Sequence, residues 1–574
     1  MINDITVLGI DLGTTNSCIA INRNKKQEVI KNNLGSNLTP SIISFVKDKR
    51  YFENQAKKFI LNNPKNTIFN MKRIIGRNFD DKEVQNDIKY WPFTVIKDEE
   101  SNKPIIEIEL NGKSEKYFPE EISGMILSYL KNLSEQYLHK KIKKAIIAVP
   151  AYFNERQRVA TVNAGKIAGF NDIKLIDEPI AAAITYAYNK TLNKNKKILV
   201  FDLGGGTLDV SIVEIGKNNF KILTTNGDNH FGGEDFDQRL VDFCCKIIEK
   251  DYKLRISDNK KLINKLKFEC EQAKILLSNN LETILYIDSF YKDIDLNIII
   301  TRSDFEAQCS DLFDKFIPII EKTLKNINLT KKEINEVILV GGSTKIPRIQ
   351  KIVKDYFKNI EFPININAEE IVAMGAAIQG RKNYSLKIAN PYSIGLNVNE
   401  KKEKNITSVL IPKNVLLPFE KTETFSTSKK NQTKIAFDVY QGENYYSKDN
   451  THIGGFVIKN IRKAEEGEVE FDVTLKLDEN GILSFLVLET DNGKYKKKFI
   501  KNVINFNDEQ IEDFKKKERQ FNKNKSEFET QNTSTYNDNE KTIRESNTFI
   551  NSSINGFEDL DKNIMRTKTE NKKI

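Results

Sequence analysis

The chain has 574 residues, of which 39% are hydrophobic and 30% are charged, so it can bury several hydrophobic cores beneath a strongly solvated surface. Lys and Arg number 90 against 80 Asp and Glu, and this excess of +10 is spread along the whole chain, which disfavours a concentrated nucleic-acid-binding face. The sequence contains no apolar run long enough for a transmembrane helix and does not begin with a basic segment followed by an apolar core. We therefore expect neither a membrane span nor a secretory signal.

The cysteines and histidines show no spacing typical of a disulfide framework or a zinc site. The five cysteines are an odd number and include no Cys-x-x-Cys pair, and the three histidines lie far apart. This usage favours a reducing compartment, and together with the missing signal it predicts a cytoplasmic protein.

The first part of the chain alternates short apolar strands with amphipathic helices, the pattern of an α/β fold. The apolar residues of 120–138 recur at helical spacing after Pro119, and Asn154 is a candidate cap for a helix that ends near Gly169. Buried strands are expected at residues 7–10, 145–149 and 198–201.

Further along the chain the pattern changes to strict alternation. Residues 469–477 alternate apolar and polar side chains, and Asn480-Gly481 then predicts a tight hairpin between two strands. This pattern predicts an antiparallel β domain, followed by an Asn-rich tail that buries too little apolar surface to fold fully. The predicted divisions are an α/β domain at 1–382, a linker at 383–390, a β domain at 391–502 and a tail at 503–574.

Two loops in different halves of the α/β domain share one pattern. Asp11-Leu-Gly-Thr-Thr and Asp202-Leu-Gly-Gly-Gly-Thr each stand between two apolar strands, so we expect two β-hairpin tips. Glycines let backbone N–H groups approach phosphate oxygens, and the aspartates suit a hydrated Mg²⁺. Either loop alone is equally compatible with a tight turn, but the matching pair predicts a site that grips a triphosphate from both sides.

A third glycine element, Gly341-Gly342-Ser343-Thr344, ends another buried strand, where a base or a ribose fits against the backbone. With these elements in this order, the sequence resembles the seventy-kilodalton heat-shock chaperone family, a branch of the actin–hexokinase ATPase superfamily, over about residues 5–500. It looks closer to the eukaryotic cytosolic branch than to bacterial relatives. Stretches that carry the resemblance are Gly9-IDLGTTNSC-Ile19, Val149-PAYFNERQR-Val159, Phe201-DLGGGTLDVSI-Val213, Asn226-GDNHFGGEDFD-Gln238 and Val340-GGSTKIPRIQK-Ile352.

The resemblance implies a two-lobed, actin-like ATPase domain that binds ATP or ADP with Mg²⁺, with K⁺ as a further candidate ion. It implies that Asp11 and Asp202 hold Mg²⁺ through water and that Lys72 reaches the γ-phosphate. Glu178 would position the attacking water, with Asp209 as a proton acceptor. Taken alone, Lys72 is an ordinary surface charge and Glu178 an acid at the start of a helix. Further residues implied at the nucleotide are Gly13, Thr14, Thr15, Gly204, Gly205, Gly206 and the catalytic Thr207 at the phosphates, and Glu271, Lys274, Ser278, Gly341, Gly342, Ser343 and Lys345 at the ribose and base.

Several positions near the expected nucleotide depart from the family pattern. Ile275 and Lys345 stand where many relatives carry arginines, Asp177 replaces an Asn, and Ala368-Glu369 replaces Pro-Asp. These changes predict weaker nucleotide affinity without loss of the Mg²⁺ and phosphate groups.

The β domain resembles the family's antiparallel peptide-binding sandwich. Phe425 and Ile435 match apolar pocket positions that receive a side chain of an extended peptide, whereas we expect Phe437 to be ordinary β core. Two positions that normally arch over the peptide are Asn399 and Ser428 here, and both are more polar than usual.

The linker is the most serious departure. Relatives carry a run of leucines that ends in Asp, whereas this chain keeps Leu386, breaks the run with Lys387 and has Ile388 at the Asp position. The family's helical lid is reduced to the Asn-rich tail, which we expect to be mostly disordered with at most a short helix. Both changes predict weak coupling between the nucleotide and peptide sites.

The function implied by the resemblance is that of an ATP-dependent molecular chaperone, a slow ATPase that binds exposed apolar segments of unfolded or extended polypeptides. A J-domain co-chaperone and a nucleotide-exchange factor are implied partners, whereas the ending Asn571-Lys-Lys-Ile574 does not match the acidic motif that tetratricopeptide co-chaperones bind. An alternative is a nucleotide-binding regulatory relative, an exchange factor or adaptor with little substrate cycling. The altered linker favours it and the intact Lys72, Glu178 and Thr207 oppose it. The β domain disfavours a sugar kinase or a filament-forming protein.

Overall fold

The structure is a computed structural model, and its chain divides into two units, residues 1–511 and 512–574. In the second unit only residues 512–521 are described, and they are helical. The expectation of a mostly disordered tail therefore concerns residues that lie largely outside the described part. The described residues are 6–521 without 25, 189, 191–193, 229, 258, 293, 364–366, 383, 401–402, 492–493, 503–505 and 507–508.

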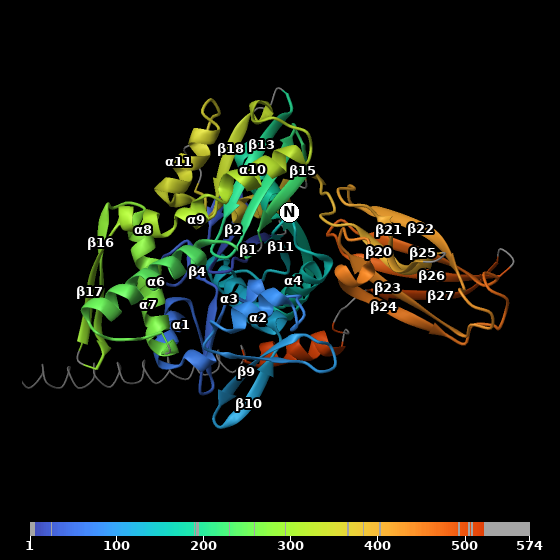
Figure 1. Cartoon of the computed structure of the whole chain (residues 1–574), viewed down its shortest axis with the longest axis horizontal. Helices are drawn as coiled ribbons and strands as arrows, with labels where there is room; N and C mark the ends of the chain where they lie inside the picture. The colour runs from blue at the N-terminus through green and yellow to red at the C-terminus, as the bar shows by residue number, and fades with distance from the viewer. Residues whose placement is uncertain are drawn as a thin grey trace, which may run out of the picture. The chain divides into compact units, whose positions relative to one another are not determined.

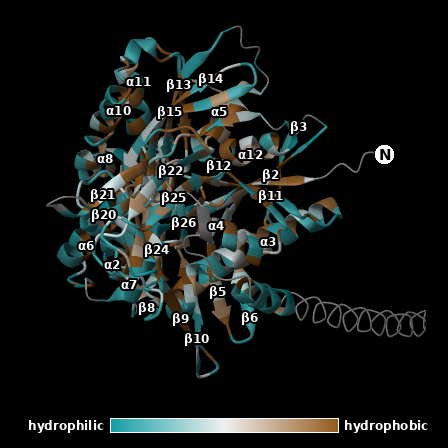
Figure 2. Cartoon of the chain, turned by 90° about the vertical axis from the view of Figure 1, so that its right-hand side faces the viewer, coloured by the Kyte–Doolittle hydropathy of each residue, from teal (hydrophilic) through white to brown (hydrophobic). Residues whose placement is uncertain are grey.

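The first half of the α/β region builds a mixed sheet whose central hairpin carries the first aspartate loop at its tip. Strand β1 (Val7–Asp11) pairs antiparallel with β2 (Asn16–Arg23) and parallel with β11 (Lys144–Val149). These strands are almost continuously apolar because both faces of the sheet are covered, and β2 and β11 are brown in the hydropathy colouring (Figure 2). The other strands of this sheet are β12 (Asp172–Asp177), β3 (Lys26–Val29) and β4 (Leu38–Pro40).

Helices cover both faces of this sheet. Helices α3 (Pro119–Leu138) and α4 (Glu155–Ile167) share one hydrophobic core with the strands, and α12 (Ile371–Lys382) packs on the opposite face. The predicted helix at 120–138 is confirmed. The predicted cap is also confirmed, because Oδ1 of Asn154 accepts a hydrogen bond from the Gln157 backbone N–H at 3.0 Å.

The second half repeats the arrangement of the first. Strand β13 (Lys196–Leu203) forms an antiparallel hairpin with β14 (Leu208–Ile215) and pairs parallel with β18 (Glu336–Val340). Figure 1 shows β13 and β18 side by side. The sheet continues from β14 through β15 (Asn219–Asp228) to β19 (Ser385–Lys387). Each aspartate loop is therefore the tip of an equivalent hairpin, as the sequence repeat predicts.

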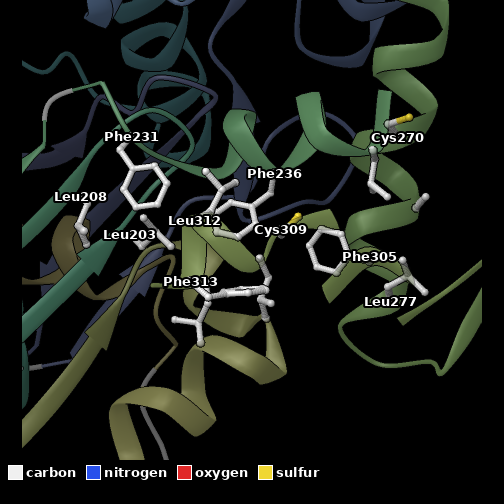
Figure 3. Packing of buried hydrophobic residues seen from close by; sticks show 14 of the residues in the cluster. Leu203, Leu208, Phe231, Phe236, Cys270, Leu277, Phe305, Cys309, Leu312 and Phe313 are labelled. Atoms are coloured by element: carbon white, nitrogen blue, oxygen red, sulfur yellow. The ribbon is translucent and has the colours of Figure 1, made fainter. Parts of the chain in front are cut away.

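The largest core lies in this second half and is rich in aromatic side chains. Phe231, Phe236, Phe305 and Phe313 pack together with buried leucines and with the thiols of Cys270 and Cys309 (Figure 3). The core joins the sheet to helices α6 (Gly233–Asp251), α7 (Lys260–Leu277), α8 (Arg302–Gln308), α9 (Ser310–Phe313), α10 (Phe316–Lys325) and α11 (Pro347–Tyr356), and to the hairpin β16 (Glu282–Tyr291) and β17 (Ile294–Thr301).

Smaller elements complete the α/β region. They are the sheets β6-β5-β7 (Lys49–Phe52, Ile42–Val46, Thr67–Phe69) and β10-β9-β8 (Lys113–Tyr117, Pro104–Leu110, Thr94–Lys97), helices α1 (Glu53–Asn62), α2 (Lys82–Ile88) and α5 (Glu178–Ala187), and the 3₁₀ turns η1 (Pro64–Asn66), η2 (Met71–Arg73), η3 (Lys331–Glu333) and η4 (Gly342–Lys345). Within the described ranges, none of the helices combines the length and the apolar character needed to cross a bilayer.

Two four-stranded antiparallel sheets follow and share one hydrophobic core, as the alternating pattern predicts. The predicted hairpin at Asn480-Gly481 joins β25 (Glu470–Leu477) to β26 (Leu483–Asp491), and Gly481 adopts a left-handed φ of 75°. Phe437 is 4% exposed in this core, which confirms its expected structural role. The strands are β21-β20-β23-β24 (Glu403–Ile411, Ile394–Glu400, Lys434–Gln441, Thr451–Lys459) and β22-β25-β26-β27 (Phe419–Ser426, Glu470–Leu477, Leu483–Asp491, Lys494–Asn502), with the 3₁₀ turn η5 (Ser447–Asp449).

The linker forms the edge strand β19, which runs parallel to β15. Leu386 is half-buried and contacts the cores on both sides of it, and the ring of Tyr384 packs edge-on against Phe220 with centroids 5.2 Å apart. Ile388 is 4% exposed and belongs to the core of the β domain. Ile388 therefore packs in the β domain and does not add to the docking of Leu386 on the α/β domain.

Candidate functional site

A cleft of about 600 Å³ contains both aspartate loops and the third glycine element. It is mixed in character, with carboxylates, ammonium groups and hydroxyls at its depth and aliphatic side chains toward the α7 and η4 end. Seventeen of the residues expected at the nucleotide line it together: Asp11, Gly13, Thr14, Thr15, Lys72, Glu178, Asp202, Gly204, Gly205, Thr207, Glu271, Lys274, Ser278, Gly341, Gly342, Ser343 and Lys345.

The two hairpin tips approach each other so closely that glycine is required. A Cβ on Gly205 would lie 2.1 Å from Oγ1 of Thr15 in the opposite loop, well inside van der Waals contact. The third element is tied to the same loop, because Oγ of Ser343 donates a hydrogen bond to the carbonyl of Gly204 at 2.9 Å. Gly341 has a left-handed φ of 83°, and a Cβ there would lie 2.3 Å from the Leu203 carbonyl oxygen. The glycines of all three elements therefore let one compact cradle form.

Lys72 and Glu178 form a buried ion pair in the depth of the cleft, with Nζ and Oε1 2.6 Å apart. Lys72 comes from the 3₁₀ turn η2, and Glu178 is the first residue of α5, so two separate elements of the α/β domain supply the pair. Asp202 and Asp209 are direct cross-strand neighbours in the second hairpin. Both carboxylate oxygens of Asp209 are buried and have no hydrogen-bond partner in the described part of the chain.

The electrostatics of this group show an excess of negative charge. Burial raises the pKa of Asp11 to about 7, a rise that Lys72 opposes and Glu178 increases. Burial also raises the pKa of Asp202 and of Asp209, with the charge of Glu178 adding to both shifts. Burial alone would lower the pKa of Lys72, but the Glu178 and Asp11 carboxylates outweigh it and raise the value. Four carboxylates thus share one ammonium group.

This charge imbalance fits a bound divalent cation. Among the described residues no group of three or more Asp, Glu, His or Cys side chains is arranged to hold a metal directly. The carboxylates of Asp11 and Asp202 instead suit a cation that keeps most of its water shell, which is the habit of Mg²⁺. Asp209, the cross-strand neighbour of Asp202, places a further buried carboxyl group beside this site.

Two of the expected residues stand behind the cleft lining. Asp209 is 1% exposed, and Gly206 lies against the guanidinium of Arg73 and the backbone of Gly232. The close approach of Gly232 to Gly206 leaves no room for a Cβ, since its nearest backbone atom would be 2.5 Å away. Asp209 and Gly206 therefore belong to the buried base of the second hairpin and do not line the cleft.

Helix α7 supplies the opposite end of the cleft. Nζ of Lys274 is 2.8 Å from Oδ1 of Asp237 and donates a hydrogen bond to the Gly233 carbonyl at 3.0 Å, which ties α7 to α6. Glu271 pairs with Lys57 of α1 at 3.4 Å and so connects the two halves of the α/β domain across the cleft. Ile275 is 50% exposed and lines the cleft. Its side chain offers an aliphatic surface rather than a guanidinium group.

Sequence reasoning missed several residues that line the cleft. Glu234 and Asp237 of α6 face it, and a signal was present, because both stand in the Gly-Gly-Glu-Asp-Phe-Asp stretch that carries the resemblance. Lys345 and Glu369 form an ion pair beside Gly342 at the cleft wall. Lys345 is one of the residues expected at the nucleotide, whereas the sequence singles out Glu369 only as a departure from the family pattern, since the pairing of the two is not visible in a linear pattern.

The residues expected to bind peptide lie on the β domain. Phe425 and Ile435 are partly buried and contact its core, and the ring of Phe425 stands edge-on to Phe437 with centroids 6.5 Å apart. Oδ1 of Asn399 accepts a hydrogen bond from the Asn405 backbone within its own hairpin. The Ser428 backbone N–H donates a hydrogen bond to Oε1 of Gln432 at 3.0 Å within the loop that joins β22 to β23. The two polar arch positions are therefore each bound within their own loop.

Comparison with known proteins agrees with this combination of a phosphate cradle and a β domain. A profile of the Hsp70 protein family matches residues 7–573. A Dictyostelium discoideum protein named heat shock cognate 70 kDa protein 3 is 39% identical over 99% of this chain and 91% of its own length. Heat shock 70 kDa proteins of Emericella nidulans and Neurospora crassa are each 41% identical, over 86% and 85% of this chain and 78% and 76% of their own lengths.

The cleft and the two sheet systems define an ATPase-type α/β domain joined to a β domain. The chain belongs to the Hsp70 family, whose members are chaperones with ATPase activity.

Proposed function

We propose that the chain is a slow ATP hydrolase in which residues 1–382 bind Mg²⁺ with ATP or ADP and residues 391–502 bind exposed apolar segments of unfolded polypeptides. The observation that supports this most strongly is the cleft itself, in which two equivalent hairpin tips face each other around a buried Lys72–Glu178 pair. Hydrolysis in the cleft would alter the affinity of the β domain for peptide.

The residues of the cleft suit phosphoryl transfer, which depends on positioning and charge neutralisation more than on covalent chemistry. The ammonium group of Lys72 would contact the γ-phosphate, while the carboxylate of Glu178 would orient a water for in-line attack. Asp209, buried and without a hydrogen-bond partner, would accept the proton of that water, and the Thr207 hydroxyl would donate to a phosphate oxygen. A Mg²⁺ held through water by Asp11 and Asp202 would neutralise phosphate charge.

The base would bind at the α7 end of the cleft, and the peptide would bind to the β domain. Glu271, Lys274 and Ser278 would contact the ribose and base, with the Gly341-Gly342-Ser343 backbone and Lys345 on the other side. In the β domain, Phe425 and Ile435 would receive an apolar peptide side chain beneath Asn399 and Ser428. A J-domain co-chaperone and a nucleotide-exchange factor are the proposed protein partners, and the cytoplasm is the proposed compartment.

Single-turnover ATP hydrolysis separates this proposal from its alternative. The full chain is loaded with labelled ATP, and the rate of product formation is measured alone, with a J-domain protein, and with an apolar peptide. Stimulation by the J-domain protein and the peptide supports a chaperone cycle. Tight binding of ATP without turnover would instead support the alternative function, a regulatory adaptor. The polar linker residues Ser385 and Lys387 favour this alternative, because they weaken the apolar run of the linker.

A further inference from the structure

A row of charged side chains crosses the second sheet of the α/β domain next to the linker. In the strand register Lys197 lies opposite Glu214, Glu214 opposite Lys221, and Lys221 opposite Lys387 of the linker strand. Side chains in one such row project from the same face of a sheet. The row therefore places three lysines and a single glutamate on one face.

Among the described residues, two of these lysines pair with no carboxylate. Lys197 pairs with one, because its Nζ is 3.8 Å from Oε1 of Glu333. Within the residues that the structure describes, no ion pair joins Lys221 or Lys387 to an acid, although Glu214 is the neighbour of Lys221 on β14. Like charges directly opposite each other in neighbouring strands are unfavourable. An anionic group placed between Lys221 and Lys387 would relieve that repulsion.

A cavity of about 330 Å³ opens at the same place. Lys197 and Lys221 line it, and most of the other lining residues are apolar. This combination suits a ligand that carries both carboxylates and aliphatic side chains. The apolar wall consists of Ile222, Leu223, Ile327, Leu329 and Leu416, and Asn414 adds an amide.

The linker strand offers little free backbone edge. Strand β19 is the last strand in the order β18-β13-β14-β15-β19, but directly after it the Leu417 N–H donates a hydrogen bond to the Ile388 carbonyl and the Asn390 N–H donates one to the Val415 carbonyl, both at 2.9 Å. The chain itself therefore occupies the continuation of this edge, and recognition at this surface depends on side chains. Ser385 and Lys387 are exposed on this strand.

We propose that this surface, made of Lys197, Lys221, Lys387 and the apolar cavity beside them, binds an extended acidic segment of a partner protein. Carboxylates of the segment would lie between Lys221 and Lys387, and an aliphatic side chain would enter the cavity. The binding uses neither the nucleotide cleft nor the peptide positions of the β domain, so the proposal does not depend on the proposed function.

The test uses the full chain with ADP and a fluorescein-labelled peptide of alternating Glu and Leu, followed by fluorescence anisotropy. We expect saturable binding that weakens as salt rises, since exposed ion pairs are screened. Lys221→Glu with Lys387→Glu should weaken binding by about tenfold or more, whereas Lys221→Arg with Lys387→Arg should retain it. A matched control is Lys246→Glu with Lys250→Glu, which makes the same charge change at exposed positions of α6.

Three outcomes would overturn the proposal. The first is equal affinity of the Lys221→Glu/Lys387→Glu and control variants. The second is displacement of the probe by an excess of an apolar peptide flanked by lysines, which would place the probe in the β domain. The third is stronger, Lys221-dependent binding of single-stranded DNA, which would make the surface a nucleic-acid site. Unchanged ADP affinity of every variant shows that the fold is intact, because neither Lys221 nor Lys387 lines the nucleotide cleft.

Discussion

Lys72 and Glu178 hold each other's side chains in position, because their charged atoms lie 2.6 Å apart in a buried site. A buried pair of this kind is costly to desolvate, and removing one member leaves the other charge uncompensated. Here the loss is moderated, because Asp11 and Asp202 also contribute to the field that keeps Lys72 charged. Lys72 therefore keeps its positive charge even when Glu178 is replaced, as its proposed role at the γ-phosphate requires.

This arrangement gives a prediction for the chemical step. Glu178→Ala and Thr207→Ala should each slow single-turnover ATP hydrolysis by about a hundredfold, because each removes a group that positions water or contacts developing charge. ATP affinity, measured by equilibrium titration, should change little. If affinity falls in proportion to the rate, these side chains bind the ground state and the assigned roles are wrong.

A second prediction concerns the metal. Asp11→Asn and Asp202→Asn each keep the shape of the side chain but remove a negative charge from the proposed Mg²⁺ site. Each should weaken the binding of ATP in the presence of Mg²⁺ more than the binding of ADP without metal, as measured by calorimetry. Equal losses for both ligands would mean that the aspartates only shape the hairpin tips.

At the scale of elements, the sequence predicts the structures that local signals specify, but it does not predict contacts between residues far apart in the chain. The helix at 119–138, the Asn154 cap, both aspartate hairpins and the Asn480-Gly481 turn follow from periodicity, capping chemistry and turn preference. The ion pair between Lys345 and Glu369 joins residues far apart in the chain, and no local rule relates them. The parallel pairing of the linker with β15 is likewise decided by packing against a distant strand.

The linker carries a prediction of its own. Its docked strand buries Leu386 only partly and leaves Ser385 and Lys387 exposed, so docking gains less than the roughly 1.5–3 kcal/mol that each fully buried leucine would add. We expect Ser385→Leu with Lys387→Leu to strengthen docking and to increase the effect of ATP on peptide release, measured by stopped-flow fluorescence.

The matched control for this linker variant is Ser385→Asn with Lys387→Arg, which keeps both side chains polar and should behave like the native chain. A large ATP effect in the native chain would contradict the expectation of weak coupling. An unchanged effect in the leucine variant would show that the edge-on packing of Tyr384 against Phe220, rather than the leucine count, decides docking.

At the scale of the whole molecule, a chain of this family combines an ATPase cleft with a β domain, and the linker strand contacts the cores of both. Allosteric coupling between two such sites typically amounts to about 1–3 kcal/mol, which corresponds to roughly a fivefold to 150-fold change in affinity. Because this linker buries few leucines, we place the coupling near the lower end of that range.

The most direct test of ATP-controlled peptide binding is the release rate of a labelled apolar peptide from the full chain, measured with ADP and with ATP. Near the lower limit of coupling, ATP should accelerate release about fivefold. The Lys246→Glu/Lys250→Glu variant should give the same ratio. Identical release rates with ATP and with ADP, in a chain that is shown to bind both nucleotides, would contradict the proposed chaperone cycle.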